Sequence, residues 1–243
     1  MQRRNRQNSG NYGDGRKIRV FRCPKEGTFS EDQLSFNCSR GIYVLCDGAS
    51  EGFNGRGWAR EVSLQSLRGR SIQWILHKAR FRFSQNWNQR SMTDWSALLA
   101  RRKGSYTTLL RVQVFPHCIE VFCIGDTAFF FLEGFHLVAG IPSLDSEYYS
   151  QSPSLLSDHP PKDSPLVIHT RIPWRAYWNP SFLLATDALA SHLCSLSLPE
   201  QKEFLQFLYR SKRKVSERYL REAKAVGLLR QDDLTYMWVR LRS

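Results

Sequence analysis

The sequence predicts a single α+β domain, a sandwich of β-sheets and helices. Short apolar runs bounded by turn residues are followed by amphipathic stretches, and then by a strand-rich block and a further helix. A chain of 243 residues is long enough to bury one substantial core. We therefore expect one folded domain over 16–243, preceded by a basic, disordered tail over 1–15.

The first half of the chain is expected to contain strands and then helices. Apolar runs bounded by turn residues predict strands over 18–23, 34–37 and 41–46. A glycine-rich turn over 52–57 leads into a mixed amphipathic pattern that predicts a helical stretch over 58–78. A similar pattern predicts a second helix over 92–102.

The second half begins with three strands in quick succession, over 106–115, 118–124 and 128–132. Pro116-His117 and Gly125-Asp126 join them, which predicts an antiparallel meander. The Pro- and Ser-rich stretch over 141–165 is typical of irregular surface chain. Strands are expected over 166–170, 181–186 and 234–241, with a basic helix before the last of them.

Short segments with Asp or Glu residues lie beside several of these strands. Strand-like runs lead into Asp47 and Asp187, and Asp232-Asp233 directly precedes the last strand, while Glu31-Asp32 lies near the second. Each carboxylate would then emerge where an apolar strand meets solvent. Carboxylate oxygens are hard ligands that suit Mg²⁺ or Mn²⁺, and carboxylates that converge would repel one another without cations. The sequence therefore predicts a metal site assembled from strand ends.

Six short segments, in this order, carry a family resemblance. They are Ser30-Glu31-Asp32, Asp47-Gly48-Ala49-Ser50, Gly104-Ser105-Tyr106-Thr107-Thr108, Ile124-Gly125-Asp126-Thr127, Ala185-Thr186-Asp187-Ala188 and Asp232-Asp233-Leu234-Thr235. Together they resemble the protein phosphatase 2C family of metal-dependent Ser/Thr phosphatases, over nearly the whole chain. The resemblance implies a four-layer α-β-β-α sandwich with two central antiparallel sheets and metals in the cleft between them.

The resemblance also implies an activity, the hydrolysis of phosphoserine and phosphothreonine in proteins through a metal-activated water, with two Mg²⁺ or Mn²⁺ ions. We hypothesise that Asp47 bridges both ions and that Asp187 and Asp232 complete the first site, which makes these three the catalytic residues. Glu31 and the Gly48 carbonyl would serve the second ion.

Two further carboxylates have weaker assignments. Asp32 would act on the metals through waters. By resemblance, Asp126 and Asp187 could hold a third, weaker ion, although Asp126 is equally well explained as an ordinary Gly-Asp hairpin turn.

The chain departs from the family pattern around the substrate. Gly27 stands where the family has a phosphate-binding Arg, so Lys25 and Arg22 are the nearest candidates to bind substrate phosphate, although either could be a solvated surface charge. Ala49 replaces a His that some members carry, which removes a possible general acid. The alternative function is therefore a catalytically weakened relative that serves as a binding or regulatory module.

The net charge of +13 predicts acidic partners. The family resemblance implies a phosphorylated protein substrate and a Ser/Thr kinase or its targets as partners. The basic late helix is explained by a solvated basic face, or alternatively by docking to acidic or multiply phosphorylated protein segments. Nucleic acid is not expected as the main partner, because no recognisable binding module or stacking platform is present.

The sequence contains no apolar run long enough to span a bilayer, and its polar, Arg-rich amino terminus does not resemble a signal peptide. The six cysteines include no Cys-x-x-Cys pair, which argues against a zinc cluster. We expect a cytoplasmic protein.

Overall fold

A computed structural model describes residues 17–25, 29–69, 71–88, 99, 101–151, 153–160 and 165–241. The expected basic tail over 1–15 lies outside the described residues. So do Gly27 and most of the helix expected over 92–102. Within the described part, no helix is both long and apolar enough to cross a membrane.

The first sheet has five antiparallel strands. In spatial order they are β1 (Lys17–Cys23), β12 (Leu234–Arg240), β11 (Pro180–Ala185), β7 (Ala128–Glu133) and β8 (His136–Ile141). We call it sheet A. The first and last strands of the domain are thus neighbours, and Cys23 pairs with Leu234 at the end of β1.

The second large sheet, sheet B, is also antiparallel. Its spatial order is β10 (Ile168–Pro173), β6 (Cys118–Ile124), β5 (Leu109–Val114), β3 (Ile42–Cys46) and β2 (Gln33–Asn37). A short pair is formed by β4 (Tyr106–Thr107) and β9 (Leu156–Ser157). The chain crosses from sheet B to sheet A between β6 and β7.

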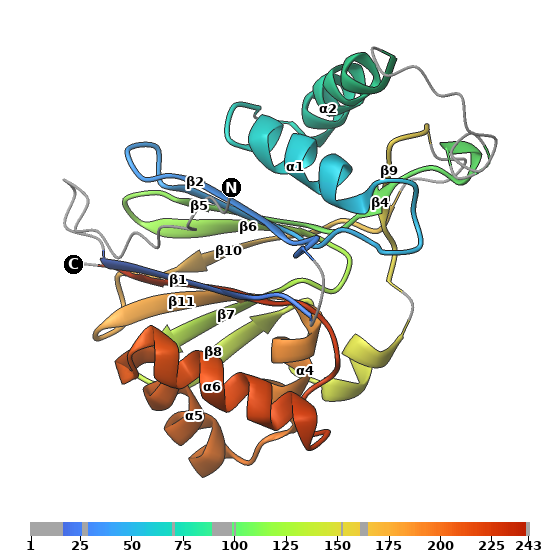
Figure 1. The fold of residues 1–243 in the computed structure, drawn as a ribbon. Helices are drawn as coiled ribbons and strands as arrows, with labels where there is room; N and C mark the ends of the chain where they lie inside the picture. Colours follow the sequence, from blue (N-terminus) through green and yellow to red (C-terminus); the bar gives the residue numbers. More distant parts are fainter. Residues whose placement is uncertain are drawn as a thin grey trace.

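Helices cover the outer face of each sheet (Figure 1). Those on sheet B are α1 (Gly55–Ser66) and α2 (Ile72–Asn88). Those on sheet A are α4 (Asp187–Ser195), α5 (Leu198–Arg210) and α6 (Arg213–Ala225), and a 3-10 helix, η1 (Ser146–Ser150), packs beside α4. The predicted four-layer α-β-β-α sandwich with two antiparallel sheets is confirmed.

The layer between the sheets is packed with aromatic side chains. Phe182 of β11 lies edge-on to Tyr43 of β3, with ring centroids 5.4 Å apart, and stacks on Phe129 of β7 at 5.6 Å. All three side chains are fully buried. Such contacts contribute about 0.5–1.5 kcal/mol beyond the burial of their area. The Tyr43–Phe182 contact joins the two sheets, whereas Phe129 and Phe182 lie on neighbouring strands of sheet A.

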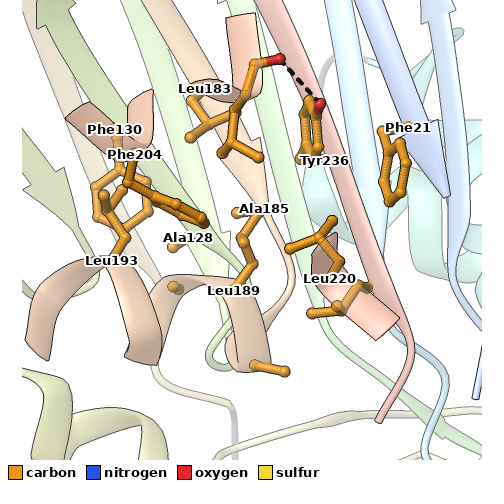
Figure 2. Packing of buried hydrophobic residues seen from close by; sticks show 14 of the residues in the cluster. Phe21, Ala128, Phe130, Leu183, Ala185, Leu189, Leu193, Phe204, Leu220 and Tyr236 are labelled. Atoms are coloured by element: carbon orange, nitrogen blue, oxygen red, sulfur yellow. Dashed lines mark hydrogen bonds between the residues drawn. The ribbon is translucent and has the colours of Figure 1, made fainter. Parts of the chain in front are cut away.

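A second core lies between sheet A and its helices (Figure 2). Phe130 and Leu183 point from the sheet toward Leu189 and Leu193 of α4. Tyr236 is fully buried, and its hydroxyl donates a hydrogen bond of 3.2 Å to the carbonyl of Leu208. The one polar atom of this ring therefore has a partner, as a buried hydroxyl needs.

Several elements differ from the sequence prediction. The helical stretch over 58–78 is divided into α1 and α2 by a break that contains Gly69, where an added Cβ would lie 2.5 Å from the Trp74 ring. The strand expected over 106–115 is interrupted at Thr108, which separates β4 from β5. The stretch expected to be irregular, over 141–165, contains η1 and β9, and β8 was not predicted.

Candidate metal centre

The predicted site carboxylates lie at turns and strand ends that belong to both sheets. Asp47 follows β3 of sheet B, and Glu31-Asp32 directly precede β2 of the same sheet. Asp187 follows β11 of sheet A and begins α4, and Asp232 lies just before β12. Asp126 lies in the turn between β6 and β7, where the chain passes from one sheet to the other. Each sheet therefore contributes to the acidic site.

Asp47 is held in place by its backbone. Its N–H donates a hydrogen bond of 2.8 Å to Thr108 Oγ1, and its carbonyl accepts from Thr107 Oγ1 at 2.7 Å and from the Thr108 N–H at 2.9 Å. The interruption of the strand at Thr108 thus serves to hold Asp47. This explains locally why the Asp47 and Thr107-Thr108 motifs occur together.

Gly48 allows the chain to pass close to the start of α1. A Cβ at Gly48 would lie 2.6 Å from the carbonyl carbon of Gly55, so no side chain fits. The Gly48 backbone also bridges to Thr107. The loop after Asp47 is therefore fixed between α1 and β4.

Asp126 is positioned through Thr108, one of the two threonines that hold Asp47. The hydroxyls of Thr108 and Thr127 are hydrogen-bonded to each other. Gly125 adopts φ +93°, a conformation that favours glycine, and a Cβ there would lie 2.7 Å from Thr108 Cγ2. The turn that carries Asp126 is therefore packed directly against the segment that holds Asp47.

A second pair of threonines joins the sheet A carboxylates. The Thr186 hydroxyl accepts from the Thr235 N–H at 3.1 Å and donates to the Asp233 carbonyl at 3.3 Å. The Thr186 N–H donates to the Thr235 carbonyl at 3.0 Å. These bonds tie the start of α4, with Asp187, to the start of β12, with Asp232.

Asp233 has a structural role that sequence reasoning did not assign. Its two carboxylate oxygens accept the backbone N–H groups of Lys25 and Glu31, each at 2.7 Å. Hydrogen bonds to an ionised acceptor are the stronger kind. Asp233 therefore fixes the two ends of the segment 25–31 against sheet A and orients Glu31. In the sequence, only its position next to Asp232 could have pointed to this role.

Asp32 and Asp47 lie in a strongly acidic environment. Asp32 is fully buried, and neither of its carboxylate oxygens has a hydrogen-bond partner. Burial raises the pKa of Asp32 to about 7, although the nearby Thr235 hydroxyl opposes this. Burial and the charge of Asp32 raise the pKa of Asp47 well above its usual value. Bringing these two anions together is therefore costly without a cation.

Asp126 and Asp187 form the other end of the acidic group. Burial and the charge of Asp187 raise the pKa of Asp126 to about 7. Burial and the charge of Asp232 raise the pKa of Asp187 as well. Arg230 opposes both shifts: its Nη1 lies 3.4 Å from Asp187 Oδ2, and it also donates to the Tyr149 carbonyl and to Ser150 Oγ. Sequence reasoning missed Arg230.

Lys25 meets the carboxylates at the solvent side. Its Nζ lies 3.8 Å from Glu31 Oε2 and 3.7 Å from Asp232 Oδ1, and it donates to Ser50 Oγ at 3.0 Å. Its side chain is 30% exposed. Arg22 instead donates to the Leu34 carbonyl at 3.1 Å, with burial as the main cause that lowers its pKa. Of the two predicted phosphate ligands, Lys25 is the one in contact with the predicted metal ligands.

The donor set is suited to a hard divalent cation. Besides both oxygens of Asp32, Asp187 Oδ1 is buried without a hydrogen-bond partner, and the mutual effects on pKa show that Asp32, Asp47 and Asp187 are close enough to interact. Oxygen ligands alone are what Mg²⁺ and Mn²⁺ prefer. Among the described residues, no three Asp, Glu, His or Cys side chains lie together in an arrangement that could already hold a metal ion. The individual ligand roles stay predictions.

The fold is similar to those of solved bacterial phosphatases. The serine/threonine phosphatase PstP/Ppp of Mycobacterium tuberculosis is 15% identical, with 94% of this chain and 99% of that chain covered and a TM-score of 0.64. The catalytic domain of serine threonine protein phosphatase PstP in complex with 2 manganese ions is 14% identical, with 94% and 99% covered and a TM-score of 0.60. Serine/threonine phosphatase Stp1 of Staphylococcus aureus is 14% identical, with 93% and 95% covered and a TM-score of 0.58.

By sequence, no protein-family model matches the chain and no curated protein is similar to it. The structural similarity covers almost the whole of both chains, at identities where it shows the fold alone. The predicted resemblance to protein phosphatase 2C-type Ser/Thr phosphatases is thereby confirmed for the fold.

Proposed function

We propose that this protein is a metal-dependent phosphatase that hydrolyses phosphoserine and phosphothreonine in proteins. The observation that carries the proposal is the group of mutually repelling, buried carboxylates at Asp32, Asp47 and Asp187, with carboxylate oxygens that have no protein partner. A chain that only bound partners would gain nothing from this unfavourable arrangement. The fold, shared with a phosphatase solved in complex with 2 manganese ions, supports the same proposal.

In this proposal Asp47, Asp187 and Asp232 hold the first Mg²⁺ or Mn²⁺ ion, and Asp47, Glu31 and the Gly48 carbonyl hold the second. When bound, two such ions lower the pKa of a water and neutralise the oxygens of a phosphoryl group. The protein positions the ligands through rigid backbone bonds, such as those from Thr107 and Thr108 to Asp47. A third, weaker ion beside Asp126 is the least supported part, since Arg230 already lies against Asp187.

Lys25 is the group we assign to the substrate phosphate. Its ammonium lies among Glu31, Asp232 and Ser50, so a phosphoryl group held there would meet a cation that is anchored at the metal site. An ammonium binds phosphate as a point charge and does not make the two-pronged contact of a guanidinium. We therefore expect weaker substrate binding than an arginine at this place would provide.

The residue after Gly48 cannot donate a proton to the leaving group, because it is Ala49, which has no titratable side chain. A leaving alkoxide from serine or threonine needs a proton, so this step should be slow. Aryl phosphates, whose leaving groups are more acidic, should depend less on such a donor. We therefore expect the protein to favour aryl phosphates in kcat over alkyl phosphates.

The proposal is tested by release of phosphate from a phosphothreonine peptide with Mn²⁺. Asp47→Asn and Asp187→Asn should abolish the activity and weaken Mn²⁺ binding measured by calorimetry. Asp145→Asn is the matched control, because Asp145 is exposed and caps η1, a task that asparagine performs equally well. This variant should keep both activity and metal binding.

Circular dichroism should first establish that all three variants are folded. Full activity in Asp47→Asn, or in wild-type protein treated with a chelator, would refute the proposal. Tight Mn²⁺ binding without hydrolysis of any phosphopeptide would favour the alternative of a weakened, phosphatase-like binding module.

A further inference from the structure

A groove of about 440 Å³ lies on the outer face of sheet A, away from the carboxylates. It is formed where the first residues of β1 meet the turn between α5 and α6. Five cationic residues line it, and no Asp or Glu does. These are Lys17, Arg19, Arg210, Lys212 and Arg213. We call it the basic groove.

The groove and the candidate metal centre lie at opposite ends of β1. Cys23 pairs with Leu234, next to the acidic site, whereas Lys17 pairs with Arg240 at the far end. A strand rises about 3.3 Å per residue, so Arg19 lies about 13 Å from Cys23 along β1. Figure 1 shows the starts of β1 and α6 at the edge opposite the start of α4.

The shape of the groove is maintained by Arg19. Its guanidinium donates to the carbonyls of Tyr209 and Ser211, which ties the α5–α6 turn to the edge strand of sheet A. The floor is aromatic: the Tyr209 and Trp238 rings lie 5.3 Å apart. Arg19 is thus occupied by the protein itself and holds the two walls of the groove together.

The remaining cations are available to a ligand to different degrees. Arg213 lies 4.0 Å from Glu217, and Arg210 lies 5.5 Å above the Phe135 ring. Lys17 and Lys212 are exposed, and no carboxylate of the described ranges is within ion-pair distance of either. Two ammonium groups without a carboxylate partner among the described residues therefore line one groove. This concentration of charge attracts anions more strongly than cations scattered over a surface.

We propose that the basic groove binds an acidic segment of a partner protein, with Asp or Glu side chains paired to Lys17 and Lys212. A peptide is favoured over nucleic acid because Trp238, the larger ring of the floor, is only 2% exposed and offers no face on which a base could stack. The carboxylates of Asp and Glu side chains would pair with the cations of the groove, while their short apolar stems would contact its partly apolar floor. The proposal does not depend on phosphatase activity, and in an active phosphatase the groove would hold an acidic part of the substrate at the end of β1 opposite the candidate metal centre.

The test is the binding of a fluorescein-labelled polyglutamate peptide, followed by fluorescence anisotropy at low and at physiological salt. The double variant Lys17→Glu/Lys212→Glu should bind roughly tenfold or more weakly, because it loses two ion pairs and gains two repulsions. The matched control is Lys78→Glu/Arg82→Glu, two exposed cations on α2 at the far side of the sandwich. The control changes the net charge equally and should bind at most about threefold more weakly, through the general field alone.

Thermal unfolding of both double variants would first establish that each is folded. An equal loss of binding in the two variants would overturn the proposal, since the attraction would then belong to the overall charge. Tighter binding of single-stranded oligothymidine than of polyglutamate, with the same dependence on Lys17 and Lys212, would also overturn it in favour of nucleic acid. Loss confined to the groove variant, with polyglutamate as the tighter ligand, would support it.

Discussion

Thr108→Val should destabilise the protein by removing one hydroxyl that holds the acidic site together. Thr108 is 3% exposed, and its Oγ1 accepts the Asp47 N–H at 2.8 Å and pairs with the Thr127 hydroxyl. Valine has nearly the same shape, so the cost comes from the lost bonds and not from a cavity. Each buried group left without a partner costs about 1–3 kcal/mol.

The two groups left without partners together predict a decrease in the free energy of unfolding of about 2–6 kcal/mol. For a domain of this size, that corresponds to a fall in Tm of roughly 4–24 °C. Denaturant unfolding with a chelator present measures the effect, and an unchanged m value would show that the folded and unfolded states remain comparable. Mn²⁺ binding should also weaken, because the Asp47 backbone loses an anchor.

Thr108→Ser is the matched control, because serine keeps the hydroxyl and removes only the methyl that packs against Gly125. It should cost about 1 kcal/mol, less than the valine variant. If valine were as stable as wild type, or if serine were the more damaging of the two, the hydrogen-bond account of the site would be refuted.

Three further predictions concern charge and packing. Because burial raises the pKa of Asp32 and Asp126 from 3.8 to about 7, the folded protein holds protons that the unfolded chain releases. The metal-free protein should therefore lose stability, on the order of a few kcal/mol, as pH rises from about 4 through 7. Saturating Mn²⁺ should remove this loss. A free energy of unfolding that does not change with pH in denaturant titrations would contradict the prediction. Lys25→Met should tighten Mn²⁺ binding several-fold in calorimetry while raising KM for a phosphopeptide, because it removes a competing cation; weaker metal binding would count against this. Phe130→Ala, at a fully buried ring of sheet A, should cost about 3–5 kcal/mol in denaturant unfolding, and a cost below about 1 kcal/mol would show that the core can refill the space.

Strands with strong apolar patterns could be predicted from the sequence, whereas some boundaries could not. The run over 118–124 is observed as β6 without change, because its apolar residues and flanking turn residues agree. β8 was missed because it is half exposed and contains a glycine, both of which weaken the pattern. The break between α1 and α2 depends on a contact of Gly69 with a later ring, which a local pattern does not reveal.

For the candidate site, the sequence indicated the acidic residues but not the cations beside them. Asp47 and Asp187 could be selected because each follows an apolar strand. Lys25 could be selected only through its proximity to Glu31 along the chain, and Arg230 had no such signal. Its contact with Asp187 depends on the tertiary packing of η1 against α4, which places Tyr149 and Ser150 within its reach.

The acidic residues are distributed between two sheets that are joined mainly by the packing of their side chains. Asp47 moves with sheet B and Asp187 with sheet A, and Tyr43, Phe129 and Phe182 fill the space between these sheets. The thickness of that aromatic layer therefore determines the distance between the carboxylates of sheet B and those of sheet A. A smaller or larger side chain there would change which ion radius fits best, although it touches no ligand. In the proposed metal-dependent phosphatase, the preference for one metal ion over another should thus be adjustable from the hydrophobic interior.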